Sequence, residues 1–330
     1  MLNIQFSIKK PSACLCFSFL CGISLSSSSI KNIHLKLAAI DIGSNAARLL
    51  ISEVIEQENK KPEFNKLNLV RVPLRLGFDV FEKTAISPKK VEMFVKTMQS
   101  YRYLMDVYQV EHYRACATSA MRDAQNSSEI IKRVMDETGL EIKVISGDEE
   151  ASAIYENHAA ENLDKDHSYL YIDVGGGSTE LNFFSDNQLL YKRSFNIGTI
   201  RLLKNQVDET LWDDLKNFIK EKTKGLKKLT AIGTGGNINK VFSLSKRKDG
   251  KPLSLDLLKD YYKELSSFPV QERMRLYNLR EDRADVIVPA LQIYINAMRW
   301  ADAEEIYIPK IGLADGLIKT LYEDVKTITN

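Results

Sequence analysis

The sequence predicts an α/β fold made of two lobes that face each other. Its 330 residues exceed one typical domain and fall short of three, which favours two. A β-meander with a glycine-rich turn occurs twice, over residues 36–76 and 169–195, and helical segments follow each copy. A repeated unit of this kind is typical of two similar lobes.

The composition is that of a globular protein with a substantial core. Hydrophobic residues make up 44% of the chain and charged residues 27%, which excludes disordered, fibrous and polytopic membrane proteins. The net charge of +2 gives a weak overall field. A polyanionic partner must therefore be held by a local basic groove.

The N-terminal 34 residues differ from the rest. Lys9 and Lys10 precede an apolar stretch at 13–25, as in a signal peptide, although the stretch is short for a membrane span. The alternatives are an ordered extension or translated upstream sequence, because residues 35–41 read like an ordinary start with Leu35 as a non-AUG initiation codon. We expect residues 1–34 to be a leader or a mis-annotated start.

Cysteine usage favours a reducing, cytoplasmic setting. Cys14, Cys16 and Cys21 lie in the leader, and Cys116 is the remaining thiol of the sequence. The spacing matches no zinc site, and one thiol in the globular part cannot form an internal disulfide.

The first half is predicted to alternate strands and helices. The predicted strands are residues 36–42, 47–55, 67–76, 113–118 and 141–145. A helix begins at Pro88 with Ser87 as N-cap, and another runs to about residue 137 from a capping box of Asn126 and Glu129. A further helix starts at Gly147.

The second half repeats the meander after a polar break at 162–167. The predicted strands are residues 169–174, 179–184 and 189–195. An apolar run at 230–232 leads into another glycine turn and a helix. The last third is mainly helical, with a buried strand at 305–308 and a final helix after Gly312.

The two meander turns predict a phosphate site. Each glycine turn follows an aspartate, Asp41 or Asp173, at the end of an apolar strand. Glycines let successive backbone N–H groups approach a phosphate, and hydroxyls such as those of Ser44, Ser178 and Thr179 add donors. The aspartates then hold Mg²⁺, which takes one or two protein carboxylates beside phosphate oxygens. Either turn alone could be an ordinary β-turn, but the matched pair favours the site.

The segment GTGGN at 233–237 follows the same plan and opens a helix, so that it presents helix N–H groups as well. A tight strand-to-helix connection is the structural alternative. Other nucleotide motifs are excluded. No GxxxxGK[ST] sequence occurs, and the turn at 175–177 leads into a strand, whereas a dinucleotide fingerprint opens a helix.

Five segments occur in a characteristic order along the chain: DIGSNAARL (41–49), TSAMR (118–122), SGDEEA (146–151), DVGGGSTE (173–180) and GTGGN (233–237). In these segments the chain resembles the exopolyphosphatase/guanosine pentaphosphate phosphohydrolase (Ppx/GppA) family in its short form without an HD domain. The resemblance implies two actin-like ATPase (ASKHA, ribonuclease H-like) lobes around a central cleft. We expect lobe boundaries at 35–160, joined by helix 312–330, and at 161–311.

The resemblance also implies functional residues. Glu150, or alternatively Glu149, is the expected base that activates water; acids in a first helical turn can also simply stabilise the helix dipole. Asp41 and Asp173 are the expected metal ligands. The expected phosphate-binding residues are Gly43, Ser44, Asn45, Arg48, Arg75, Arg122, Gly175, Gly176, Gly177, Ser178, Thr179, Arg201, Gly233, Gly235, Gly236 and Asn237. Arginine is favoured because its planar fork binds phosphate with two hydrogen bonds.

Lysines at 220–228 and 246–251 could extend a polyphosphate track, although such runs are more often solvated surface. The sequence departs from the family in two places. The family's second catalytic glutamate is expected near residues 118–122, where Asp123 is the nearby acid. The LREG-like C-terminal motif reads LADG at 313–316.

The predicted activity is release of the terminal phosphate from polyphosphate or guanosine pentaphosphate (pppGpp), assisted by Mg²⁺ with a monovalent cation as an optional second ion. The rivals are a phosphotransferase or ATPase on the same fold, for which segment 233–237 would cradle a base or ribose, and a non-catalytic sensor. We expect no nucleic-acid partner, no membrane unless the leader is genuine, and leave a homodimer open.

Overall fold

A computed structural model describes residues 33–57, 60–158, 167–186, 188–226, 229–309 and 311–329. Residues 1–32, and so nearly all of the predicted leader, lie outside the described residues, as do residues 162–166 of the predicted polar break and Lys227 and Lys228 of the predicted lysine track. The first strand begins at Ile33, two residues before Leu35, where the part of the chain after the leader was predicted to start.

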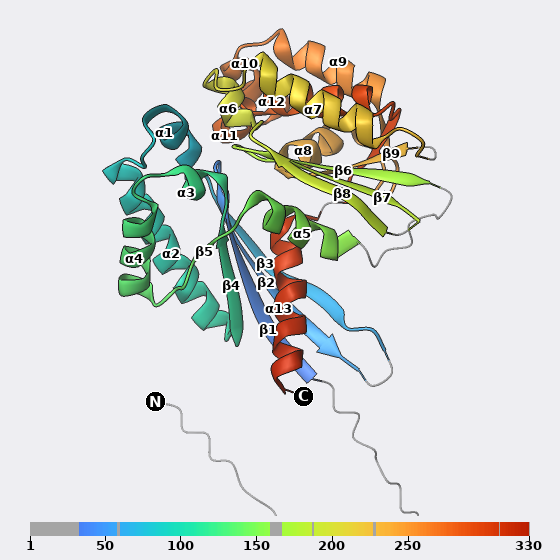
Figure 1. Ribbon diagram of the computed structural model, residues 1–330. Coiled ribbons are helices and arrows are strands. Elements are labelled where there is room, and N and C mark those ends of the chain that lie inside the picture. Colours follow the sequence, from blue (N-terminus) through green and yellow to red (C-terminus); the bar gives the residue numbers. More distant parts are fainter. Residues whose placement is uncertain are drawn as a thin grey trace, which may run out of the picture.

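The described strands form one mixed sheet in each lobe (Figure 1). The first has the order β3(Glu63–Val72), β2(Ala47–Glu56), β1(Ile33–Ile42), β4(His112–Ala117) and β5(Lys143–Val144). The second has the order β10(Leu253–Ser254), β11(Glu305–Tyr307), β9(Leu229–Thr234), β6(Ser168–Val174), β7(Thr179–Ser185) and β8(Gln188–Phe195). The prediction of two α/β lobes with a repeated meander is confirmed.

Helices cover both sheets. They are α1(Leu76–Lys83), α2(Pro88–Tyr108), α3(Ser119–Asp123), α4(Ser127–Thr138), α5(Gly147–His158), α6(Thr199–Leu203), α7(Glu209–Lys222), α8(Gly236–Ser245), α9(Leu255–Ser266), α10(Val270–Tyr277), α11(Glu281–Ala284), α12(Ile287–Trp300) and α13(Leu313–Thr329). The last helix returns to the first sheet, where Leu317 and Ile318 share a core with Leu37 and Cys116 (Figure 1). Cys116 is a free, buried thiol. No helix in the described ranges has both the length and the apolar run that crossing a bilayer requires.

The two meander turns have the same backbone geometry. In the first, Ile42 pairs with Ala47 and the N–H of Gly43 donates to the carbonyl of Ala46 at 3.1 Å. In the second, Val174 pairs with Thr179 and the N–H of Gly175 donates to the carbonyl of Ser178 at 2.9 Å. The same type of hairpin turn therefore joins the first two strands of each lobe.

The prediction of a third strand at 67–76 was wrong in its limits. β3 begins at Glu63, opposite Ile55, and ends before Pro73, which has no N–H to donate to a ladder. α1, which sequence analysis missed, begins at Leu76 after Arg75 in the left-handed region at φ 54°.

Of the two predicted helix caps, the N-cap position of α2 is confirmed and the capping box of α4 is not. Ser87 is at the N-cap of α2 with Pro88 at the first helical position, as predicted, but its hydroxyl donates to Asp79. The capping box at Asn126 was wrong, because the Asn126 amide exchanges two hydrogen bonds with the backbone of Ile86. The strand predicted at 141–145 shortens to Lys143–Val144, and that at 305–308 to Glu305–Tyr307, with Ile306 as its buried residue.

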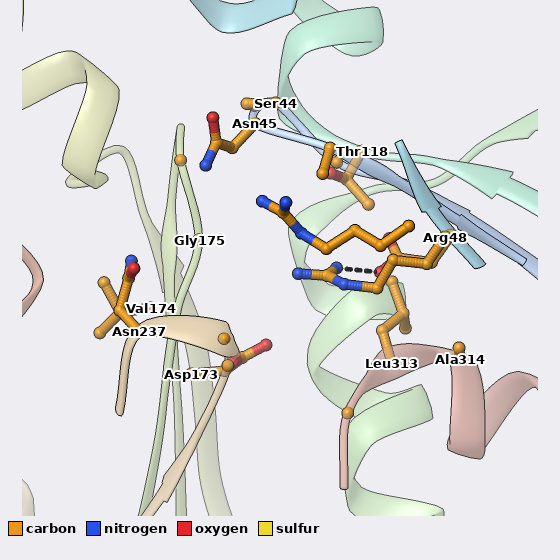
Figure 2. A pocket seen from close by; sticks show the side chains of 18 of the residues that line it. Ser44, Asn45, Arg48, Thr118, Asp173, Val174, Gly175, Asn237, Leu313 and Ala314 are labelled. Atoms are coloured by element: carbon orange, nitrogen blue, oxygen red, sulfur yellow. Dashed lines mark hydrogen bonds and ion pairs between the residues drawn. The ribbon is translucent and has the colours of Figure 1, made fainter. Parts of the chain in front are cut away.

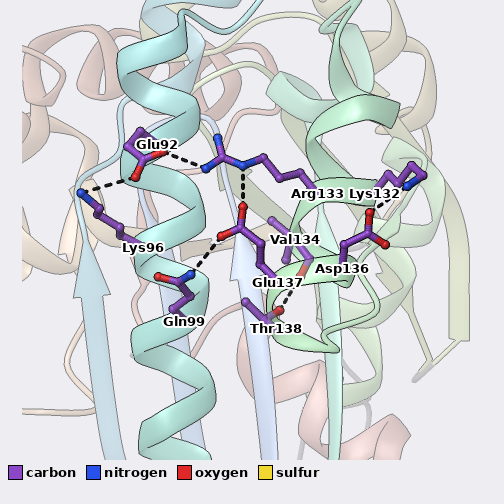
Figure 3. A network of polar contacts seen from close by, with 9 residues as sticks. All are labelled: Glu92, Lys96, Gln99, Lys132, Arg133, Val134, Asp136, Glu137 and Thr138. Carbon is purple, nitrogen blue, oxygen red and sulfur yellow. Dashed lines mark hydrogen bonds and ion pairs between the residues drawn. The ribbon is translucent and has the colours of Figure 1, made fainter.

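The long helix α2 joins core and surface. Phe94 and Tyr101 are fully buried against the first sheet. On its solvent side, Arg133 of α4 bridges Glu92 at 2.8 Å and Glu137 at 2.6 Å (Figure 3). Exposed ion pairs contribute far less free energy than apolar burial.

We therefore expect Phe94→Ala to lower the free energy of unfolding by about 3–5 kcal/mol, because it leaves a cavity in the core. Arg133→Ala should lower it by less than about 1 kcal/mol, since water replaces the lost contacts. Urea denaturation followed by circular dichroism measures both. A larger loss for the arginine variant would contradict this ranking.

Candidate active site

A cavity of about 190 Å³ lies between the lobes, where the strand ends of both sheets meet. Figure 2 shows Ser44 and Asn45 on one side and Gly175 and Asn237 on the other, with Arg48 reaching into the space between. The lining residues from the two meander turns and the loop before α8 are Asp41, Gly43, Ser44, Asn45, Asp173, Gly175, Gly176, Ser178, Gly235, Gly236 and Asn237. Several glycine segments thus converge on one space.

The two meander turns contact each other directly across the lobe boundary. A Cβ added at Gly176 would lie 2.9 Å from Cβ of Ser44, and one at Gly177 would lie 2.4 Å from Oγ of Ser119. The Ser44 and Ser119 hydroxyls are hydrogen-bonded at 2.8 Å. Glycine is required here because no side chain fits between the turns.

The loop before α8 forms the third wall. Gly235 has φ 104° and lies so close to β6 that a Cβ would be 2.9 Å from Oδ1 of Asp173. Gly236 and Asn237, which follow it, contact Arg283 of α11, and Nη1 of Arg283 donates to Oδ1 of Asn237 at 2.7 Å. The first N–H groups of α8 are therefore positioned at the cavity.

Arginines give the cavity its positive charge. Arg48 donates to Asp41 at 2.5 Å, and Arg71 donates to Asp282 at 2.5 Å while its Nε and Nη2 have no partner among the described residues. Burial lowers the pKa of Arg283 to about 9, and repulsion from Arg71 and Arg48 adds to this. Guanidinium groups held together against their own repulsion form a site for an anion.

Sequence analysis missed Arg71 and Arg283. Arg71 pairs with Arg48 across β2 and β3, so the meander pattern could have located it once the strand limits were known. Arg283 lies in a short helix of the helical last third, where no motif marks it.

Buried carboxyl groups lie at the cavity or close behind its wall. Burial raises the pKa of Asp173 to about 6, with Asp41 adding repulsion. Glu150 on α5 and Glu180 on β7 are also buried, and each has an Oε2 without a partner in the described part of the chain. Burial raises the pKa of Glu180 to about 7, and burial together with the Glu180 charge raises that of Glu150 well above its usual value.

Glu180 was also missed as a site residue. It alternates with Leu181 in β7, which predicts a solvent face, yet β7 is buried on both sides. Oε1 of Glu180 accepts a hydrogen bond from the Ser194 hydroxyl at 2.8 Å. Glu180 is thus a second buried glutamate that interacts with Glu150, whereas Asp123 near the expected segment pairs with Arg201; neither Glu180 nor Asp123 lines the cavity.

Glu149 points away from the cavity. Its carboxylate accepts from the N–H of Ser146 at 2.8 Å and pairs with Lys143 at 2.7 Å, while its own N–H donates to Oγ of Ser146 at 3.1 Å. The Lys143 and Ser146 contacts lower its pKa to about 2. Glu149 caps α5, as the dipole alternative anticipated, and a carboxylate of such low pKa is a poor proton acceptor.

Several other expected phosphate ligands have protein partners outside the cavity. Arg75 pairs with Asp285 at 2.5 Å, Arg122 donates to the carbonyl of Ile145 at 2.7 Å, and Arg201 donates to the carbonyl of Gly177 at 2.7 Å. The Thr179 hydroxyl donates to the Ile197 carbonyl at 2.5 Å. Gly233 packs against Ile306. These residues build the walls behind the cavity.

The carboxyl groups are compatible with magnesium. Asp41 and Asp173 face the same cavity, and Mg²⁺ bound beside phosphates needs few protein carboxylates. No set of three His, Cys, Asp or Glu side chains in the described ranges has the spacing of a metal site made by protein alone. The donor set thus fits an ion that shares its ligands with a phosphate substrate.

The family model for the Ppx/GppA phosphatase family matches residues 54–325. The chain belongs to this family. Membership confirms the resemblance inferred from the motifs, and it confirms the prediction of a hydrolase that acts on phosphoric anhydrides.

Relatives agree with this assignment. A bifunctional 3-dehydroquinate synthase/phosphatase of Fusobacterium nucleatum is 33% identical over 75% of this chain, which spans 39% of that protein's length. Exopolyphosphatase 1 of Mycobacterium tuberculosis is 23% identical over 86% of the chain and 87% of its own length. The crystal structure of an exopolyphosphatase from Cytophaga hutchinsonii, 24% identical, superposes with a TM-score of 0.76 over 88% of this chain and 98% of that one. The predicted actin-like, two-lobed fold is confirmed.

Adding a methyl group between the turns should damage the site. We expect Gly176→Ala to weaken binding of pyrophosphate by roughly tenfold to a hundredfold, because the added Cβ pushes Ser44 and Ile200 away. Isothermal titration calorimetry measures the affinity.

Gly139→Ala is the control, since Gly139 has φ 67° and no neighbour within 4 Å of an added Cβ. It should cost about 1 kcal/mol of stability from backbone strain and leave binding intact. Equal binding losses in both variants would mean that the turn contact has no special role.

Proposed function

We propose that this protein is a phosphohydrolase that releases the terminal phosphate of inorganic polyphosphate, with pppGpp as the second substrate to be compared. The single observation that carries the proposal is the cavity itself, which is lined by glycine turns of both lobes, by Arg48, Arg71 and Arg283, and by the buried carboxyl group of Glu150, with Glu180 buried near Glu150. Phosphoryl transfer depends mainly on positioning and charge neutralisation, and this arrangement supplies both.

The substrate's terminal phosphate binds between the meander turns. Backbone N–H groups of the turns and of the first residues of α8 donate to its oxygens, and Ser44 and Ser178 add hydroxyl donors. Arg71 and Arg283 take the negative charge of the next phosphates, because Arg71 keeps two donors without a described partner and Arg283 donates to the neutral amide of Asn237.

A water molecule attacks the terminal phosphorus in line with the bridging oxygen. Glu150 accepts the proton of the water as its oxygen bonds to phosphorus, the bridging P–O bond breaks, and its electron pair leaves with the shortened chain. Burial and mutual repulsion raise the pKa of both Glu150 and Glu180, so the pair tends to hold a proton near neutral pH, and the reaction proceeds from the form in which Glu150 is ionised.

Magnesium is the metal that this donor set suits. Asp41 and Asp173 would hold it together with substrate oxygens, and it would neutralise charge on the phosphates when bound. The Ser194 hydroxyl orients Glu180, and the Asp41 contact orients Arg48, whether or not the ion is present.

The substrate is tested by a phosphate-release screen of the full chain with long polyphosphate, pppGpp and ATP. The relative named as an exopolyphosphatase supports release from polyphosphate. Turnover of ATP only with an ADP or sugar acceptor would favour a phosphotransferase. Tight binding of polyphosphate without phosphate release would favour the sensor.

The glutamates can be separated by conservative substitution. We expect Glu150→Gln to lower kcat by about 10²–10⁴-fold, because it removes the proton acceptor while keeping the side-chain volume. Glu149→Gln should cause a much smaller loss, since this residue caps α5 on the far side. Malachite-green assays measure phosphate release. Comparable losses in both variants would rule out Glu150 as the specific base.

The activity should also depend on pH in a defined direction. Because burial raises the pKa of Glu180 to about 7 and that of Glu150 above its usual value, lowering the pH below about 7 protonates both members of the pair. We therefore expect kcat/KM to fall as the pH drops from about 8 to about 5.5. A profile that is flat across this range would contradict a buried glutamate as the base.

A further inference from the structure

We propose that Lys66 forms a distal subsite, where it binds phosphates far from the reacting end of a polyphosphate chain and so favours long chains over short ones. In the structure its ammonium group pairs with Asp315, and a phosphate of the chain takes the place of that carboxylate. The inference rests on the proposed function, because the subsite belongs to the same cavity and makes long polyphosphate the preferred substrate.

The cavity extends along β3, away from the meander turns. Its lining includes Lys66, Leu69 and Arg71 of β3 and residues 311–315 at the start of α13. Leu69 is 57% exposed, so the cavity opens to solvent on this side. Figure 2 shows the start of α13 beside Arg48. A chain whose terminal phosphate lies between the turns can therefore leave between β3 and the start of α13.

An irregularity in β3 turns Lys66 toward this opening. Leu69 stands opposite Leu50 of β2, and Lys66 stands opposite Ser52, so that Leu67 is an extra residue where the register shifts. Side chains alternate between the faces of a strand. In an unbroken register Leu67 would stand opposite Ser52, and Lys66 would point to the other face. The bulge thus places a cation where regular alternation predicts a leucine.

Neighbouring contacts agree with this face. Phe64, two residues before Lys66, contacts Tyr322 of α13 with ring centroids 5.5 Å apart. Nζ of Lys66 itself lies 2.5 Å from Oδ1 of Asp315, on the same helix. Arg71 lies on this face at the end nearer the turns, where it lines the cavity. The face of β3 toward α13 therefore carries one cation near the turns and another farther out.

The two cations are separated along the strand. Arg71 and Lys66 stand opposite Arg48 and Ser52 of β2, and these positions are roughly 13 Å apart along a strand. In the proposed function the terminal phosphate lies between the turns, and the next phosphates meet Arg71. A pyrophosphate ion held there ends near Arg71, whereas a long chain continues past Lys66. Contact with Lys66 therefore depends on chain length.

The pair of Lys66 and Asp315 can open without loss of the start of α13. Oδ1 of Asp315 pairs with Lys66, while Oδ2 accepts the N–H of Gly312 at 2.9 Å. The Lys66 side chain is 48% exposed, and an ion pair in contact with water contributes little free energy. A phosphate offers a charge and several acceptor oxygens to an ammonium group. Lys66 can thus turn to a phosphate while Asp315 keeps its contact with Gly312.

The Asp315 carboxylate limits the affinity of the distal subsite. It remains at the opening after the exchange, and its charge repels the chain. Ala314, beside it, lines the cavity without a charge. Segment 313–316, which departs from the LREG-like motif, therefore gives this wall an acid and no cation. Lys66 supplies the positive charge from β3 instead.

The test uses Lys66→Gln, Lys66→Arg and Asp315→Asn in the full chain, with Lys326→Gln as the matched control. Lys326 pairs with Glu56 of β2 at 3.0 Å and is 50% exposed, so it also joins α13 to the first sheet. It lies in the last turn of α13, at the end of the helix away from the cavity. Malachite-green assays give the KM for long-chain polyphosphate, counted per chain end. Isothermal titration calorimetry gives the affinities for pyrophosphate and for long-chain polyphosphate.

We expect Lys66→Gln to raise the KM for long-chain polyphosphate by about threefold to tenfold, because a charge-assisted hydrogen bond is lost. The preference for long-chain polyphosphate over pyrophosphate in binding should fall by a similar factor. Lys66→Arg keeps the charge and should keep this preference, and Lys326→Gln should leave it in place. Asp315→Asn should lower the KM by about twofold to fivefold, since a repelling charge is removed while the amide oxygen still accepts from Gly312.

Other results would overturn the proposal. Equal losses in Lys66→Gln and Lys326→Gln would mean that Lys66 only fastens α13 to the sheet. Equal effects of Lys66→Gln on pyrophosphate and on the long chain would remove the dependence on chain length. A raised KM in Asp315→Asn would show that the intact ion pair is what matters. The expected changes have opposite signs at the two partners of one ion pair, and a loss of stability in both variants cannot produce them.

Failure of the proposed function is recognised separately. If the unaltered chain releases no phosphate from polyphosphate, the proposed function fails, but calorimetry still tests the distal subsite because binding needs no turnover. A preference for long-chain polyphosphate that falls in Lys66→Gln then supports the subsite. A preference that is unchanged in this variant overturns it.

Discussion

The contact between the two glycine turns is the constraint on which the site depends. Gly176 and Ser44 belong to different lobes, and the space between them cannot hold even a methyl group. The carbonyl of Gly176 accepts from the N–H of Ile200 at 2.8 Å, which fixes the second turn from behind. In the proposed function a phosphate bound between the turns contacts both lobes, so the spacing of the lobes is part of the proposed binding site.

This constraint explains the distribution of charge around the cavity. Strand ends that meet so closely bring Asp41, Asp173, Glu150 and Glu180 together, and the mutual repulsion of buried acids is costly unless cations or protons offset it. Arg48 offsets Asp41, and proton uptake offsets the glutamate pair. Arg48, Arg71 and Arg283 repel one another in turn. An anionic chain lying across the cavity relieves that repulsion.

Much of this arrangement could be predicted from the residue pattern. The meanders, their aspartates and the converging glycine segments are local features, because each follows from a short apolar run ending at small residues. The limits of β3 and the existence of α1 could not be obtained in this way, since Pro73 and the left-handed Arg75 end one element and begin another within four residues. The capping box predicted at Asn126 was wrong because the rule considers only neighbours in sequence, whereas the Asn126 amide bonds to Ile86 across a loop.

The site residues that escaped sequence analysis share a physical cause. Glu180 alternates with apolar neighbours and so resembles a solvent-facing position, but packing of α5 over β7 buries it and changes its ionisation. Arg283 gains its role only because α11 approaches the loop before α8. Conversely, Glu149 and Glu150 are adjacent and chemically identical. They differ because successive side chains point to different faces of α5, so that Glu149 caps the helix and Glu150 is buried. The role of each of these side chains therefore depends on tertiary contacts, which set its burial and its neighbouring charges, and the local sequence pattern does not contain that information.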